Sequence, residues 1–148
     1  MKIILASRKY LKEIMEIENE CFLEPFKEEN IIYELEENAF SFFYLALENE
    51  RVVGFLDFWI TFDSSTICQI AIREEYRNKG IASCLLNKMF NDLKDKDVVV
   101  STLEVRTHNL SAINLIVSLL IIGFPQSLQY KIGIGTPHAR CLEMHHSE

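Results

Sequence analysis

The stretch from Ile70 to Ser83 reads Ile-Ala-Ile-Arg-Glu-Glu-Tyr-Arg-Asn-Lys-Gly-Ile-Ala-Ser and is the most informative part of the sequence. An apolar strand pattern ends at Ile72, and Gly80 stands where a long helical pattern begins. The first N–H groups of a helix have no partner inside it, so together with the helix dipole they form an anion site. Gly80 and Ala82 keep the approach free of side-chain bulk. The stretch therefore predicts a phosphate or diphosphate site; the alternative is an ordinary strand–turn–helix with a solvated basic turn.

Positive charge is concentrated in this turn, although the chain as a whole is acidic. Arg73, Arg77 and Lys79 are expected to supply it, in a chain whose net charge is −7. That acidic balance argues against a general nucleic-acid-binding protein, which carries a basic face. With 148 residues, 49% of them hydrophobic, the chain suits one packed domain over residues 1–148 and excludes wholesale disorder.

Strand and helix patterns alternate on both sides of this stretch. Ser7 is the expected cap of the first helix, and Ile31, Ile32 and Leu35 are the expected buried stripe of the second. The third helix carries Cys84 beside its apolar stripe, which indicates a core thiol. The order predicts a mixed α/β (α+β) domain. The expected helices cover 7–21, 27–37, 80–94 and a segment from 109 or 111, and the expected strands cover 3–6, 42–47, 52–60, 66–72, 98–105, 128–134 and 140–144.

Several features are informative because of what they exclude. The four cysteines are widely spaced without a Cys-x-x-Cys pair, which argues against structural zinc and a disulfide framework. His145 and His146 are expected to be surface residues, and no metal is expected. The apolar runs are too short for a signal peptide or for the roughly 18 residues of a membrane span, so we expect a cytoplasmic protein without a membrane partner.

The motif Arg77-x-x-Gly80-x-Ala82 resembles the acyl-CoA pyrophosphate loop of the GNAT superfamily of N-acetyltransferases, whose pattern is Arg/Gln-x-x-Gly-x-Gly/Ala. The order of elements is also similar to that fold. Three further strings resemble the RimI branch, the ribosomal-protein-alanine N-acetyltransferases, and the resemblance runs over residues 1–115. They are Cys21-Phe22-x-x-Pro25-Phe26, Leu103-Glu104-Val105-Arg106-x-x-Asn109 and Ala112-Ile113-x-Leu115.

The resemblance implies a GNAT (acyl-CoA N-acyltransferase) fold, with a central, mostly antiparallel sheet and helices on both faces, and acetyl-CoA as cofactor. It implies that Glu104 is the general base, acting through water. Without the resemblance, the position of Glu104 at a strand end would indicate a solvated edge residue. Asn109 is implied to contact the cofactor, and its alternative is a helix cap. The other implied cofactor contacts are the pantetheine strand Ile70, Ala71 and Ile72 and the diphosphate loop Arg77, Asn78, Lys79, Gly80, Ile81, Ala82 and Ser83.

The activity implied is transfer of an acetyl group from acetyl-CoA to the N-terminal α-amino group of a protein, with a ribosomal protein as the acceptor. A monomer or weak homodimer is expected. One alternative is a small-amine acetyltransferase of the same fold, acting on a polyamine, amino sugar or amino acid. The other is an acyl-CoA-binding module with little or no catalysis.

The chain departs from the RimI pattern after residue 107. RimI-type enzymes carry a tyrosine acid seven residues after the matched asparagine, and this chain has Ile116 there, which cannot donate a proton. Three explanations are open: a register shift that brings another group such as Tyr130 to the sulfur, a weakened homologue, or a reading-frame change.

Residues 13–37 hold ten glutamates and one lysine. This composition predicts either a solvated helical face or an acidic rim that attracts a cationic N-terminal peptide.

Overall fold

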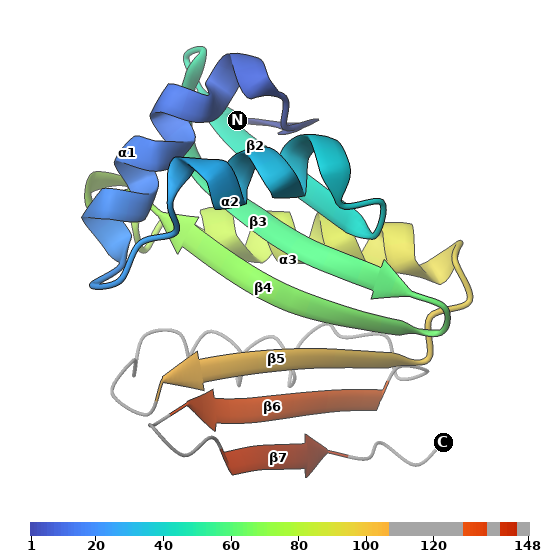
Figure 1. Ribbon diagram of the computed structural model, residues 1–148. Helices are drawn as coiled ribbons and strands as arrows, with labels where there is room; N and C mark the ends of the chain where they lie inside the picture. The colour runs from blue at the N-terminus through green and yellow to red at the C-terminus, as the bar shows by residue number, and fades with distance from the viewer. Residues whose placement is uncertain (107–128, 136–139, 145–148) are drawn as a thin grey trace.

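The computed structural model describes residues 1–106, 129–135 and 140–144 and arranges them around one seven-stranded sheet (Figure 1). Strands β1 to β4 are antiparallel, β5 is parallel to both β4 and β6, and β7 is antiparallel to β6. The strands are β1 (Lys2–Leu5), β2 (Ser41–Glu48), β3 (Arg51–Thr61), β4 (Ser64–Ile72), β5 (Val100–Arg106), β6 (Gln129–Gly135) and β7 (Arg140–Met144).

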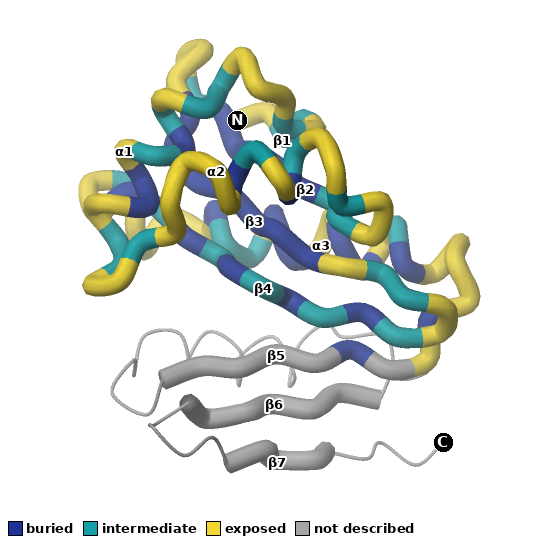
Figure 2. Tube along the Cα trace, viewed as in Figure 1, coloured by how far each residue is buried: buried dark blue, intermediate teal, exposed yellow. Residues whose placement is uncertain are grey.

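Helices cover both faces of the sheet, as predicted. Helices α1 (Leu11–Cys21) and α2 (Glu28–Ile32) lie on one face, and α3 (Ile81–Lys94) lies on the other (Figure 1). Each face has its own apolar core, which Figure 2 shows as buried segments. The α3 side packs Leu85 and Met89 against Phe58, and the α1 side packs Ile14 and Ile17 against Phe55.

The strands expected over 42–47 and 52–60 are present and form an antiparallel hairpin. Asn49 and Glu50 form its two-residue turn, with φ of 48° and 64°. Positive φ at both central residues gives the backbone twist that tight hairpins require. The predicted helix from Asn109 or Ser111 lies outside the described residues.

Three local expectations are wrong. Ser7 makes no side-chain cap hydrogen bond, because a short 3-10 turn over Arg8–Tyr10 precedes α1. The second helix becomes a π-helical segment at Tyr33–Glu37, which changes the face that its side chains present, so that Glu34 is buried while Leu35 is only half-buried. Cys84 is exposed, because it lies on α3 just outside the buried stripe that Ile81 begins and Leu85 continues.

A β-bulge in β4 sets the geometry of the site. Asp57 pairs with Gln69 and Phe58 pairs with Ile67, so Cys68 has no partner on β3. Pairing of β4 with β5 also stops at this level, because its last pair is Ile67 with Leu103. Since a bulge bends its strand, β4 leaves β5 where the bulge begins.

Candidate active site

The turn before α3 presents backbone N–H groups to solvent. Gly80 is its N-terminal cap residue with φ of 78°, and Asn78 is also left-handed at 61°. Among the described residues, none accepts a hydrogen bond from the amides of Ile81, Ala82 or Ser83. A Cβ atom on Gly80 would have no described residue within 4 Å, so nothing in the described structure fills the space before the helix. Open amides at the start of a helix have the arrangement that an anion site requires.

The last residues of β4 offer a second row of backbone groups. The Arg73 amide donates to the Val53 carbonyl at 2.8 Å, so the alternation of an antiparallel ladder directs the groups of Ala71 toward β3. The groups of Ile70 and Ile72 therefore face the β5 side, beyond the last β4–β5 pair. Of the three predicted pantetheine residues, Ile70 and Ile72 thus have outward-facing backbone groups, whereas Ala71 pairs with Phe55.

The Ile72 carbonyl fixes the end of β4 to two neighbouring segments. It accepts hydrogen bonds from Arg77 Nε at 3.0 Å and from the Cys21 thiol at 3.3 Å. The Arg77 guanidinium is exposed, and the Lys79 ammonium lies 5.2 Å from the centre of the Tyr76 ring. Arg77 and Lys79 thus bring positive charge to the turn that precedes α3.

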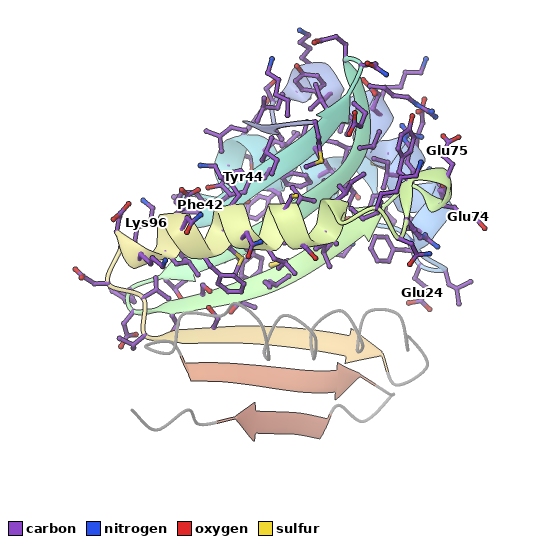
Figure 3. All side chains as sticks on the ribbon, turned by 180° about the vertical axis from the view of Figure 1, so that it is seen from behind. Glu24, Phe42, Tyr44, Glu74, Glu75 and Lys96 are labelled. Carbon is purple, nitrogen blue, oxygen red and sulfur yellow. The ribbon has the colours of Figure 1, made fainter. Side chains whose placement is uncertain are left out.

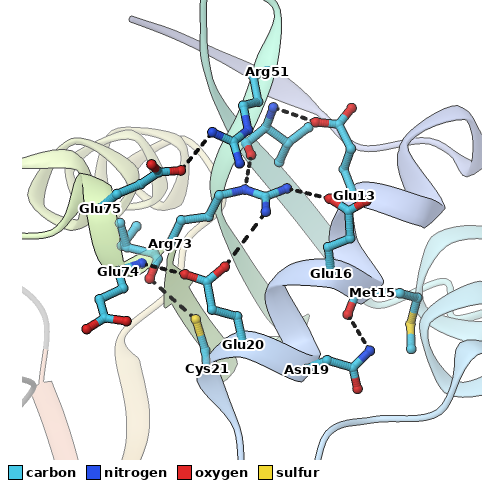
Figure 4. Close-up of polar contacts among 12 residues, drawn as sticks. Glu13, Met15, Glu16, Asn19, Glu20, Cys21, Arg51, Arg73, Glu74 and Glu75 are labelled. Atoms are coloured by element: carbon cyan, nitrogen blue, oxygen red, sulfur yellow. Dashed lines mark hydrogen bonds and ion pairs between the residues drawn. The ribbon is translucent and has the colours of Figure 1, made fainter.

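Arg73 does not contribute to that charge, contrary to the sequence-based expectation. Its guanidinium is buried and donates to the Val52 carbonyl at 2.7 Å and to Glu16 at 3.0 Å (Figure 4). Glu20 lies 3.7 Å from the same guanidinium. Arg73 thus joins α1 to the sheet, and its charge is neutralised there.

The acidic composition of residues 13–37 is partly structural for the same reason. Glu13 accepts the amide of Val52 at 2.8 Å, and Glu20 accepts the amide of Glu74 at 2.7 Å (Figure 4). Glu18 and Glu34 are buried. The expectation of a uniformly solvated face is therefore wrong for these residues.

Glu104 lies one residue beyond Leu103, the last residue of β5 that pairs with β4. Its backbone is therefore at the level where β4 and β5 diverge. On the neighbouring strand, Tyr130 pairs with Ser101, three residues before Glu104 on β5. Asn109 and Ile116 lie outside the described residues.

Residues 11–119 match the acetyltransferase (GNAT) family, which is more than half of the chain. The chain belongs to this GNAT family. A putative [ribosomal protein bS18]-alanine N-acetyltransferase of Bacillus subtilis is 30% identical over 99 residues, covering 67% of this chain and 66% of that protein. The Escherichia coli [ribosomal protein bS18]-alanine N-acetyltransferase is 31% identical over 72 residues, 49% of either chain. The GNAT chain thus matches about half to two thirds of the length of these relatives.

Solved structures share the GNAT fold of this chain. The Escherichia coli ribosomal-protein-S18-alanine N-acetyltransferase has a TM-score of 0.73 at 24% identity, covering 80% of this chain and 75% of that chain. The PaiA N-acetyltransferase of Thermoplasma acidophilum, solved with coenzyme A, has a TM-score of 0.72 at 18% identity, covering 80% and 88%. The predicted fold class is confirmed.

Other parts of this GNAT domain contribute less to the site. A cavity of about 520 Å³ lies between β1 and α3, with Phe42, Tyr44 and Lys96 in its wall. Figure 3 shows these residues at the opposite end of α3 from Glu74 and Glu75, so the cavity is separate from the open amides. In the described part of the chain, no helix is long and apolar enough to cross a membrane.

The sequence reasoning missed one group of residues, the buried polar cluster of Glu18, Glu34, Asp57 and Gln69. A signal for it exists, since Asp57 is the one charged residue of the otherwise apolar run 52–60. A charge inside a buried strand indicates a special environment.

Proposed function

We propose that this GNAT chain transfers an acetyl group from acetyl-CoA to the N-terminal α-amino group of a protein, with a ribosomal protein as the acceptor. The observation that supports the proposal is that two sets of backbone groups, unpaired in the described structure, lie at the two ends of one strand–turn–helix segment. One is the amides of Ile81, Ala82 and Ser83, and the other is the outward-facing edge of β4 at Ile70. Cytoplasm is the proposed location, because ribosomal proteins are made there.

The residues present fit a coenzyme A thioester. The diphosphate is expected to accept hydrogen bonds from the three amides of α3, with Asn78, Lys79 and Gly80 in the turn and Arg77 and Lys79 adding positive charge. The outward-facing backbone groups of Ile70 and the N–H of Ile72 suit the amide groups of a pantetheine arm, which would take the place of a neighbouring strand. The Ile72 carbonyl is already occupied by Arg77 and Cys21. Asn109 stays a proposed cofactor contact, on the resemblance alone.

Glu104 is the proposed general base. An α-amino group has a pKa near ~8 and is largely protonated at neutral pH, so its proton must be removed before the nitrogen attacks a thioester carbonyl. The Glu104 carboxylate would accept this proton, directly or through one water. The Ile70 N–H, which faces the space between the diverging strands β4 and β5, would stabilise the oxyanion that develops on the thioester carbonyl. Acetyl-CoA supplies the activated acyl group.

The acceptor class rests on the relatives of this chain. Both curated relatives described above are called bS18-alanine N-acetyltransferases, one of them putative. A small-amine acetyltransferase and an acyl-CoA-binding module without useful catalysis remain as the outcomes that the experiment must separate.

The test is a mass-spectrometric acetylation assay with a peptide that copies the N-terminus of ribosomal protein bS18. We expect acetylation of its α-amino group, and no acetylation of the same peptide with a blocked N-terminus but free lysines. Turnover of a polyamine without turnover of the peptide would support the small-amine enzyme. Acetyl-CoA binding by calorimetry without turnover of either substrate would support the binding module.

A further inference from the structure

Four buried polar side chains meet on the α1 side of the sheet, beside the bulge of β4. Glu18 comes from α1, Glu34 from the π-helical segment, Asp57 from β3 and Gln69 from β4. Glu18 and Asp57 are 0% exposed, Glu34 is 8% exposed and Gln69 is 9% exposed. We call these four residues the acidic cluster.

Within the described part of the chain, the hydrogen-bond donors to the acidic cluster are neutral groups. Glu18 accepts the Phe26 amide at 3.0 Å, and Glu34 accepts the Trp59 indole N–H at 2.7 Å. Asp57 accepts the Ser41 hydroxyl at 3.0 Å. Among the described residues, no lysine, arginine or histidine forms an ion pair with these three carboxyl groups.

The acidic cluster is short of donors. One side-chain oxygen each of Glu18, Asp57 and Gln69 is buried without a hydrogen-bond partner in the described structure. Three buried negative charges without a counter-charge would cost far more than a few kcal/mol, so the cluster must retain protons. A protonated carboxyl group also supplies one of the missing donors.

Asp57 is the group best placed to hold a proton. Its burial, followed by the nearby charge of Glu34, raises the pKa of Asp57 to about 8. Burial also raises the pKa of Glu18. The titratable groups that face Asp57 are Glu18 from α1, Glu34 from the π-helical segment and Cys68 from β4, while β2 contributes the hydroxyl of Ser41.

The position of Asp57 links this proton to the proposed reaction. Asp57 is paired with Gln69, and the next residue pair is shifted by the bulge at Cys68. The bulge begins immediately after Ile67, the last β4 residue that pairs with β5. The next segment of β4, residues 70–72, has its unpaired edge on the β5 side, where β4 and β5 diverge.

We propose that Asp57 is a positioning residue for acyl transfer: its neutral carboxyl group lets Glu18 of α1 and Glu34 of the π-helical segment pack beside it at the bulge of β4, and the bulge sets the direction of residues 70–72. This inference rests on the proposed function. Loss of the proton would place a further negative charge among Glu18 and Glu34, and the repulsion would displace the bulge. Turnover would then decrease at alkaline pH.

The test compares the wild-type protein with Asp57→Asn, which keeps the shape and cannot ionise. We expect the ratio of kcat/KM, variant to wild type, to rise about tenfold between pH 7 and pH 9, as expected for a required proton whose pKa is about 8. Using the ratio cancels titration of the acceptor amine. Asp97→Asn, at an exposed residue between α3 and β5, is the matched control. Its kcat/KM divided by that of the wild type should stay constant, near one, at every pH.

Glu34→Gln provides a second variant in case Asp57→Asn does not fold. Removing the Glu34 charge makes Asp57 easier to ionise, so the alkaline decrease should move to lower pH. An Asp57→Asn ratio that is constant from pH 7 to 9, or an unmoved decrease in Glu34→Gln, would overturn the role of Asp57 while leaving the proposed function intact. Wild-type protein without turnover at any pH would overturn both.

Discussion

Gly54 lies opposite Ile72 in the β3–β4 ladder, and the two residues are too close for any side chain on Gly54. A Cβ atom there would lie 2.5 Å from the Ile72 Cδ1 atom and 2.8 Å from the carbonyl oxygen of Ala71. Gly54 therefore lets the end of β4 approach β3, and it helps to set where the outward-facing edge of β4 lies.

Substituting Gly54→Ala should move the end of β4, because the clash involves backbone as well as a side chain. We expect a loss of unfolding free energy of about 1–3 kcal/mol, the usual cost of overpacking, and weaker acetyl-CoA binding. Urea unfolding and calorimetric titration measure the two effects. Unchanged stability and unchanged affinity would show that β3 and β4 accommodate the methyl group without strain. The close approach of Gly54 to Ile72 would then not be needed for acetyl-CoA binding.

Gly80→Ala should weaken acetyl-CoA binding for two reasons. The left-handed φ of 78° disfavours alanine by about 1–2 kcal/mol, and the new methyl group would enter the open space before α3. Asp97→Ala is the matched control, since Asp97 is also left-handed, with φ of 55°, and lies at the other end of α3. It should lose stability without losing affinity. Equal affinities of wild type and Gly80→Ala would contradict the proposed anion site.

Glu104→Gln should decrease kcat by roughly 10²-fold or more, because general-base catalysis is commonly worth ~10²–10⁴-fold. The decrease should be largest at low pH, where the amine is most protonated, and acetyl-CoA affinity should change little. Glu37→Gln, at an exposed residue, serves as the control. If the rate of Glu104→Gln equals that of the wild type at all pH values, Glu104 is not the base.

The contribution of Asp57 to the stability of the folded chain should decrease as pH rises from about 4 to about 8. The folded-state pKa of Asp57 is about 8 against an ordinary value of 3.8, so the unfolded chain loses its proton first. The stability that this proton contributes is complete below the pKa of Asp57 in the unfolded chain and is lost as pH rises through its pKa in the folded chain. Between the two pKa values, the free energy of unfolding should fall by about 1.4 kcal/mol per pH unit. Denaturation at several pH values gives the free energy of unfolding of the wild type and of Asp57→Asn. The difference between the two should show this slope. A difference that does not depend on pH would mean that Asp57 is ionised in the folded chain.

Local patterns predicted much of the fold. The α3 stripe, the turn at Asn49 and Glu50 and the glycine before α3 depend on neighbours in sequence, and the structure has all three. The β4 strand was predicted to within two residues at its start, because alternation of apolar residues has a fixed period. The proposed anion site depends on the same features.

Contacts between distant segments could not be predicted in this way. Arg73 follows β4 like a basic turn residue, but Glu16, 57 positions away, draws its side chain inward. The exposed Cys84, the π-helical segment and the bulge at Cys68 likewise depend on packing against other elements. Asp57 could have been identified as unusual, but its partners Glu18 and Glu34 are brought to it only by the fold.

The central claim is that the amides opening α3 bind the diphosphate of a coenzyme A thioester. The most direct measurement is titration of isotopically labelled protein with acetyl-CoA, observed through the amide resonances of Ile81, Ala82 and Ser83. We expect these three resonances and that of Ile70 to shift together and saturate with one dissociation constant. Saturable binding that leaves them in place, or no binding at millimolar ligand, would contradict the account.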